Sequence, residues 1–218
     1  MGLNKVIFSE YKAKNFLSKY VSVSKGRLID IKKAQLILKN QALGEIKFPI
    51  VLKIVSDSVL HKTDVGGVKI AYNADEFFKH LEFLLGISKK FKSQGILIEE
   101  YVAGQELIIG LKKDKTFGHI IGLGLGGVFV EILKSISFRK CPIDEDDFES
   151  MIKDIKAKEI LFARKKQVNI DSLKRACISI SKIPESVQGK KILELDINPF
   201  ILNEHEGKAV DARIVFEK

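Results

Sequence analysis

The C-terminal part of the chain presents oxygen-bearing side chains at alternate positions. Glu194, Asp196 and Asn198 fall on one face of a predicted strand, because alternate residues of a strand point to the same side. The residues between them are apolar and fall on the opposite face. Carboxylate and carboxamide oxygens are hard ligands that suit Mg²⁺, especially Mg²⁺ that arrives with a phosphate substrate. The pattern therefore predicts part of a magnesium site.

A second predicted strand carries Asp211 and Arg213, and it follows a polar loop that ends in Gly207, as hairpin loops do. If the turn is centred between residues 204 and 205, Asn198 lies opposite Asp211 and Asp196 lies opposite Arg213. This register gathers two carboxylates and a carboxamide on one patch of sheet, beside an arginine. A slip of one residue would move Asp211 to the other face, so the predicted site depends on the register.

Lys53 lies between Leu52 and Ile54 in a strand that is otherwise apolar, predicted over residues 50–54. A buried lysine is costly unless it has an ionic partner or meets the charge of a ligand. One interpretation is that Lys53 binds phosphate oxygens. The alternative is a lysine whose ammonium reaches water at the strand end, and the residues alone favour neither.

The loop after this strand contains His61 and the pair Gly66-Gly67. Paired glycines allow close approach to a phosphate, and their N–H groups can bind it. A neutral imidazole could attack phosphorus and form a phosphohistidine. The alternative for His61, a solvated loop histidine, stays open on the residues alone.

A glycine-rich stretch at residues 122–127 superficially matches a dinucleotide-binding fingerprint. We reject that interpretation, because the glycines lead into a strand-like segment and the fingerprint must open a helix. A connection that touches a ligand and a tight turn both remain open. Downstream, Glu131 and Arg139 are charges in apolar surroundings, so each is expected to have a partner, and arginine suits planar recognition of phosphate.

A predicted strand ends near Glu100, where we place a junction between two lobes, residues 1–100 and 101–218. The backbone from Glu100 to Val102 could meet the edge of an adenine, and Glu106 could accept hydrogen bonds from ribose hydroxyls. The order of elements is mixed, with several strands adjacent in sequence. This order favours an α+β fold over a doubly wound sheet. Helices are expected over residues 10–20, 31–43, 73–91, 144–155 and 169–182.

The composition is that of a globular protein. The chain has 218 residues, of which 45% are hydrophobic and 30% charged. No apolar run approaches the roughly 18–20 residues of a membrane span, and the two cysteines form no CxxC motif. We therefore expect a cytoplasmic protein without a membrane partner. The net charge of +9 could indicate an anionic partner, but the lysines are scattered, so we expect a solvated surface and no nucleic-acid partner.

Three segments, taken in order, resemble the ATP-grasp domain of the ADP-forming acyl-CoA synthetases, and in particular the β subunit of the acetate–CoA ligase type. They are FPIVLKIVSDSVLHKTDVGGVKI, ILIEEYVAGQELIIGLKKDKTFGHIIGLGLGGVFVEILKSISFRKCPID and ELDINPFILNEHEGKAVDARI. The resemblance covers nearly the whole chain. It implies an α+β ATP-grasp fold in which two lobes clasp a nucleotide.

The resemblance also implies a role for each candidate residue. Catalytic roles would fall to His61, which would relay the phosphoryl group, and to Asp196 and Arg139, which would lie beside it. Asn198 and Asp211 would hold Mg²⁺. The nucleotide would be contacted by Lys53, Gly66, Gly67, Glu100, Val102, Glu106 and Glu131.

The reaction implied by the resemblance converts acyl-CoA, ADP and phosphate into the free acid, CoA and ATP. It would need an α subunit with CoA-binding and phosphohistidine domains, in a heterotetramer-like assembly. The phosphoryl group would pass from a histidine of that partner, through His61, to ADP. The alternative is a non-catalytic, nucleotide-binding regulatory module of ATP-grasp type. Retention of Lys53, His61 and the acidic hairpin argues against it.

Overall fold

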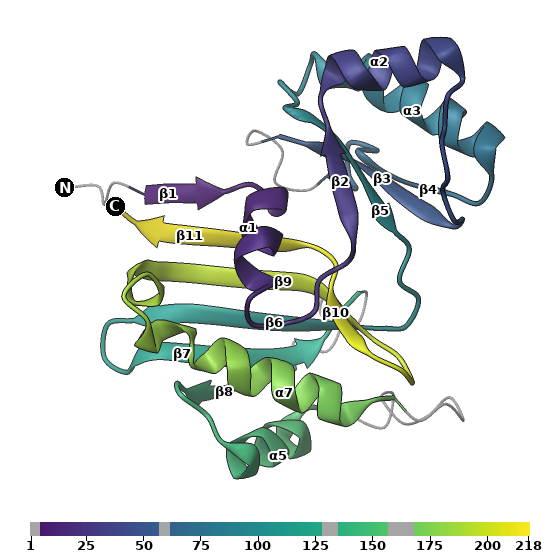
Figure 1. Ribbon diagram of the computed structural model, residues 1–218. Coiled ribbons are helices and arrows are strands. Elements are labelled where there is room, and N and C mark those ends of the chain that lie inside the picture. Colours follow the sequence, from purple (N-terminus) through teal and green to yellow (C-terminus); the bar gives the residue numbers. More distant parts are fainter. Residues whose placement is uncertain (1–4, 57–61, 128–134, 157–167) are drawn as a thin grey trace. The chain divides into compact units, whose positions relative to one another are not determined.

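The computed structural model describes residues 5–56, 62–127, 135–156 and 168–218. The chain divides into two compact units (Figure 1). Unit 1 holds the described residues up to Val23 together with Val102–Lys218, and unit 2 is Ser24–Tyr101. No helix in the described parts of the chain is both long and apolar enough to cross a membrane.

Unit 2 is an antiparallel sheet with two helices packed on it. The strand order within the described residues is β2-β5-β3-β4. Its elements are β2 (Gly26–Ile29), α2 (Ile31–Asn40), β3 (Ile50–Val55), β4 (Val68–Ala71), α3 (Ala74–Ser88) and β5 (Gly95–Glu100). Both helices begin with a side-chain cap, because Asp30 accepts from the N–H of Lys33 and Asn73 accepts from the N–H of Glu76.

Strand alternation gives the sheet of unit 2 two different faces. Leu52 and Ile54 of β3 join a core with Phe77 and Leu81 of α3. Lys53 lies between them and therefore points to the other face, although it is also buried. The helices thus account for one face only, and the other face carries a buried charge.

Unit 1 is built on a larger sheet. The order among the described strands is β1-β11-β9-β6-β7-β8, and β10 also pairs with β9. The strands are β1 (Lys5–Phe8), β6 (Gln105–Asp114), β7 (Gly118–Leu125), β8 (Ile136–Lys140), β9 (Ile192–Leu202), β10 (Gly207–Ala209) and β11 (Ala212–Glu217). The helices are α1 (Glu10–Leu17), α5 (Glu145–Asp154), α7 (Ile170–Ser181) and the short 3₁₀ turns η1 (Ile183–Glu185) and η2 (Gly189–Lys191).

Helices α1 and α7 lie on the same side of this sheet (Figure 1). They pack on alternate residues of the strands, among them Ile109, Ile197 and Ile214, in one apolar core. The residues between these, which include Asp196 and Arg213, belong to the opposite face. The core therefore fixes which side of the sheet presents the polar residues.

The division into units differs from the expected one at the N-terminus. The expected first lobe began at residue 1, but β1 pairs with β11, from Lys5 opposite Glu217 to Phe8 opposite Ile214. The described residues up to Val23 therefore belong with the C-terminal part of the chain. A strand of four residues that pairs with the far end of the chain leaves no local pattern in the sequence.

Candidate functional site

The C-terminal hairpin has the register that the sequence predicts. Arg213 lies opposite Asp196 in the β9–β11 ladder. One step further, the N–H of Asn198 donates to the carbonyl of Asp211 at 3.2 Å. At the turn, the Asn203 side chain accepts hydrogen bonds from the two backbone N–H groups of residues 205 and 206. The prediction of this register is confirmed, and its cause is local turn chemistry combined with alternation.

Asp196 has a charged neighbour on one side and open space on the other. Arg213 faces it from β11, and Gly110 faces it from β6. A Cβ atom on Gly110 would have only the Leu195 carbonyl within 4 Å, at 3.8 Å. Asp196 is half-buried and Asn198 is exposed. The glycine therefore leaves room for a ligand beside the carboxylate.

The electrostatics of this patch favour a bound cation. Burial raises the pKa of Asp196 above its ordinary value, the charges of Glu194 and Asp211 raise it further, and Arg213 lowers it. A divalent cation beside Asp211 would relieve this repulsion. Among the described residues, no group of three or more His, Cys, Asp or Glu side chains could hold a metal unaided. Asn198 and Asp211 fit a magnesium ion that takes its remaining ligands from water and phosphate.

The raised pKa of Asp196 has a consequence for stability. The folded protein holds this proton at a higher pH than the unfolded chain does, so ionisation at neutral pH opposes folding. Asp196→Asn should therefore raise the free energy of unfolding at pH 7 by about 0.5–2 kcal/mol. The gain should vanish below the ordinary value of 3.8, where both states are protonated. Urea unfolding at several pH values measures it.

Asp114 provides a control, because its pKa is shifted in the opposite direction. The N–H groups of Phe117 and Thr116 bind its carboxylate and lower its pKa. Asp114→Asn should therefore reduce stability at neutral pH, and the reduction should fade as the pH falls. A loss of stability at pH 7 in Asp196→Asn would contradict the account of the site electrostatics.

In unit 2, Lys53 is paired with Glu99. The Lys53 Nζ lies 3.0 Å from Glu99 Oε2, and the two side chains are only 4% and 2% exposed. The hydroxyl of Ser24 donates to the other oxygen of Glu99 at 3.4 Å. Strand register explains the pairing, since Val51 lies opposite Glu99 and Lys53 is two residues further along the same face of β3. The ammonium is therefore buried rather than at the solvent-exposed strand end of the alternative interpretation.

Glu99 was not among the candidate residues. Its signal in the sequence is weak, because it stands next to Glu100 at the end of a strand, where two acidic residues suggest a solvated edge. The useful signal is the alternation of side chains along the strand. Glu99 shares its face of β5 with Leu97, a fully buried residue, and Glu100 does not.

The N–H groups of the glycine pair donate hydrogen bonds within their own loop. The N–H of Gly66 donates to the Thr63 carbonyl at 3.0 Å, and the N–H of Gly67 donates to the Lys62 carbonyl at 2.7 Å. In this conformation both N–H groups are therefore engaged within the loop, and their contact with phosphate stays a prediction. Gly66 has a φ of +68°, and a Cβ atom on Gly67 would lie 2.8 Å from the Ile54 side chain. Both positions need glycine for the turn and for close packing.

Glu100 and Val102, which are predicted to meet the nucleotide base, lie in different surroundings. The Glu100 carboxylate accepts from the N–H of Lys25 at 2.8 Å, and the N–H of Glu100 donates to the Lys25 carbonyl at 2.9 Å. Val102 is the first residue of unit 1 after this strand, and it is half-buried. Contacts of Glu100 and Val102 with an adenine stay predictions, and the N–H of Glu100 is already engaged.

Glu106 is exposed and lies against the end of the glycine-rich stretch. The N–H of Gly126 donates to its carbonyl at 2.7 Å. Gly127 has a φ of +63°, and a Cβ atom there would lie 2.9 Å from Glu106 Oε2. Gly126 and Gly127 thus lie close against Glu106, whereas Gly122 and Gly124 lie within β7. Glu106 itself remains exposed. Its contact with a ribose stays a prediction.

Arg139 is bound to α5. Its guanidinium donates to Ser150 Oγ and to Asp154 Oδ2, both at 2.6 Å. It also donates to the Phe138 carbonyl at 2.8 Å. The catalytic role of Arg139 stays a prediction, and in this conformation its guanidinium fixes α5 against β8. The remaining two candidates, His61 and Glu131, lie outside the described residues.

Comparison with known proteins places these features in a family. The family model of the ATP-grasp domain matches residues 4–216, so the chain belongs to the ATP-grasp family. A relative in Pyrococcus furiosus, the β subunit of acetate–CoA ligase (ADP-forming) I, is 38% identical over 180 residues, which cover 79% of this chain and 77% of that protein. In Archaeoglobus fulgidus, acetate–CoA ligase (ADP-forming) I is 38% identical over 177 residues, 78% of this chain. The match spans only 26% of that longer protein.

Solved structures agree with these relatives. Acetyl-coenzyme A synthetase 1 of Candidatus Korarchaeum cryptofilum, in complex with coenzyme A and Ca-AMPCP, is 39% identical to the chain, with a TM-score of 0.84. The match covers 96% of this chain and 93% of that one. Another structure of that enzyme holds coenzyme A and Mg-AMPPCP, and its phosphohistidine segment points towards the nucleotide-binding site. That structure is 38% identical to this chain, with a TM-score of 0.76. The match covers 95% of this chain and 92% of that one.

Proposed function

We propose that this chain is the nucleotide-binding β subunit of an ADP-forming acid–CoA ligase of the acetate–CoA ligase type. The reaction converts acyl-CoA, ADP and phosphate into the free acid, CoA and ATP. The observation that carries the proposal is the hairpin register, which sets Asn198 against Asp211 and Asp196 against Arg213 in a chain of the ATP-grasp family. The relatives of known name support the choice of reaction.

The residue types suit phosphoryl transfer, which depends mainly on positioning and on neutralising charge. In this proposal Lys53 binds phosphate oxygens of the nucleotide, and Asn198 and Asp211 hold Mg²⁺. The metal, when bound, neutralises charge on the phosphates. Asp196 lies beside the transferred phosphoryl group, and Arg213 limits the repulsion between that group and the carboxylate.

The phosphoryl group reaches ADP in two transfers. In the first, the P–N bond to a histidine of the α subunit breaks while a P–N bond to His61 forms. In the second, the β-phosphate oxygen of ADP attacks phosphorus, the bond to His61 breaks and ATP forms. A neutral imidazole can carry the group between the two positions.

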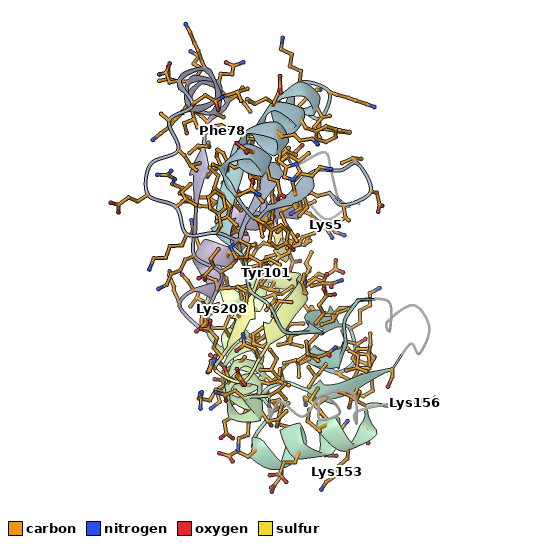
Figure 2. The ribbon with its side chains drawn as sticks, turned by 90° about the vertical axis from the view of Figure 1, so that its right-hand side faces the viewer. Lys5, Phe78, Tyr101, Lys153, Lys156 and Lys208 are labelled. Carbon is orange, nitrogen blue, oxygen red and sulfur yellow. The ribbon has the colours of Figure 1, made fainter. Side chains whose placement is uncertain are left out.

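The partner in this proposal is an α subunit that carries the CoA-binding and phosphohistidine domains, in a heterotetramer-like assembly. Two findings support it: relatives named as β subunits, and the phosphohistidine segment of the Korarchaeum enzyme. The reaction belongs in the cytoplasm, where its CoA and nucleotide substrates are found. Exposed lysines such as Lys5 on β1 and Lys153 on α5 lie on separate elements rather than in one patch (Figure 2). This scatter does not favour a nucleic-acid partner.

Calorimetric titration tests the proposal. The purified chain is titrated with ADP, with and without Mg²⁺, and with GDP and a short RNA as comparators. We expect micromolar binding of ADP that depends on Mg²⁺ and no binding of RNA. If the folded chain also fails to bind MgADP when the α subunit is present, the proposal is wrong. If the assembled enzyme binds MgADP but forms no ATP, the regulatory module is the better assignment.

The metal assignment predicts a specific defect in two variants. Asn198→Ala and Asp211→Ala should each weaken ADP binding about tenfold in the presence of Mg²⁺, because one oxygen ligand is lost. ADP affinity without Mg²⁺ should not change. Glu204→Ala is the control, since Glu204 is exposed at the tip of the same hairpin. Unchanged Mg²⁺ dependence in both variants would remove the metal assignment.

A further inference from the structure

Helix α1 places an ion pair inside unit 1. Lys14 Nζ lies 3.2 Å from Glu10 Oε1, one helical turn away, and the two side chains are only 4% and 3% exposed. Their neighbours on α1, Ala13 and Leu17, belong to the apolar core. A buried ion pair gains little stability over apolar residues of the same volume. Its presence therefore calls for a reason other than packing.

The Lys14 ammonium also reaches the C-terminal hairpin. It donates to the carbonyl of Val210 at 3.2 Å, across 196 positions of sequence. Val210 immediately precedes Asp211 in the link between β10 and β11. Helix α1 lies across β11 (Figure 1). The contact therefore ties the N-terminal helix to the segment that carries the proposed metal ligand.

Backbone hydrogen bonds hold this link from two sides. On the side of β9, the N–H of Val210 donates to the Pro199 carbonyl at 3.1 Å and the carbonyl of Asp211 accepts from Asn198 at 3.2 Å. On the other side, the N–H of Ala209 donates to the Ser22 carbonyl at 2.9 Å. The Lys14 ammonium supplies the fourth contact. The Lys14 contact comes from a side chain, and the other three contacts are between backbone groups.

We propose that Lys14 is a positioning residue, which holds the Val210-Asp211 link so that Asp211 stays opposite Asn198. The effect of Lys14 on metal binding rests on the proposed function, whereas its effect on the position of the link does not. Glu10 has a separate task in this arrangement. It neutralises the ammonium, which would otherwise place an uncompensated positive charge next to a cation site.

The test compares Glu10→Gln/Lys14→Met with wild type in the full chain. The double variant removes both charges and keeps the side-chain volumes, since Lys14→Met alone would leave Glu10 buried without its cation. Hydrogen exchange is measured at the backbone amides of Val210 and Asn198, which report the link directly. We expect both to exchange at least about tenfold faster, while amides of α5 do not change.

A control pair separates positioning from a general effect of removing an ion pair. Glu145→Gln/Lys174→Met removes another pair of unit 1, in which Lys174 Nζ lies 2.9 Å from Glu145 Oε2, and it should leave these amides unchanged. Equal exchange in wild type and in Glu10→Gln/Lys14→Met would overturn the proposal.

A second measurement connects the link to the metal. ADP titrations should show that Glu10→Gln/Lys14→Met weakens the Mg²⁺-dependent binding about five- to tenfold and leaves Mg²⁺-free binding as in wild type. If the wild-type chain binds no MgADP even with the α subunit, the proposed function fails, and hydrogen exchange still decides whether Lys14 positions the link. Faster exchange with unchanged Mg²⁺ dependence would overturn the role of this positioning in metal binding.

Discussion

Lys53→Met is expected to weaken ADP binding about 10- to 100-fold and to destabilise the chain as well. The loss of affinity follows from the loss of a charge-assisted contact to phosphate, worth about 1.5–3 kcal/mol. The loss of stability follows from the ion pair. Lys53 Nζ and Glu99 Oε2 are 3.0 Å apart, and both side chains are almost fully buried. Removing one member of such a pair typically costs about 3–5 kcal/mol.

The double variant Lys53→Met/Glu99→Gln separates the two effects. With both charges gone, most of the lost stability should return, because the cost comes from burying one charge without the other. ADP affinity should stay as low as in Lys53→Met, because the phosphate still lacks its cation. Urea unfolding gives the stability, and calorimetry gives the affinity.

Lys113→Met is the matched control for the substitution itself. Lys113 Nζ lies 3.0 Å from Glu217 Oε2, but the two side chains are 40% and 37% exposed. An exposed pair of this kind contributes about 0–1 kcal/mol, so the variant should stay close to wild type in both measurements. Wild-type ADP affinity in the folded double variant would contradict the phosphate role of Lys53.

The parts of the fold that the sequence predicts well are those with a local signal. The C-terminal hairpin is one, because alternation in residues 193–198 and the polar loop that ends in Gly207 are local signals, and the register assumed for the hairpin is the observed one. Helix α3 is another, because Asn73 and Glu76 form a recognisable start for it. In both cases the interactions that define the element join residues close in sequence.

The parts that were missed depend on distant contacts. Strands β1 and β2 have four residues each, which is too short for a clear alternating pattern in the sequence. β1 becomes a strand through its pairing with β11, more than 200 residues away, and this pairing moves the N-terminal segment to unit 1. No window of sequence contains both partners.

The candidate site shows the same limit at the level of side chains. The sequence indicates that Lys53 and Arg139 need partners, but it does not say which ones. For Lys53 the partner is Glu99, across the β3–β5 ladder. For Arg139 the partners are on α5, so the contacts seen for this residue are structural ones. Residue type predicts the need for a partner, and tertiary structure decides whether that partner is a ligand or the protein.

His61→Ala is expected to reduce ATP formation by at least about a thousandfold in the assembled enzyme, because removal of a covalent nucleophile removes the pathway that it serves. The binding of MgADP should stay within about twofold of wild type. The assay supplies acyl-CoA, phosphate and ADP to the chain with its α subunit. His205→Ala is the control, because the His205 side chain is 81% exposed on the hairpin.

Labelling distinguishes a relay from an indirect effect of His61. With radioactive phosphate and acyl-CoA, and without ADP, the wild-type chain should acquire an acid-labile label, as expected of a phosphorus–nitrogen bond. The label should leave when ADP is added, because the phosphoryl group then passes to the nucleotide. His61→Ala should leave the chain unlabelled while the α subunit still labels, which places the defect at the transfer between subunits. ATP formation at the wild-type rate in His61→Ala would show that the partner histidine delivers the phosphoryl group to ADP directly.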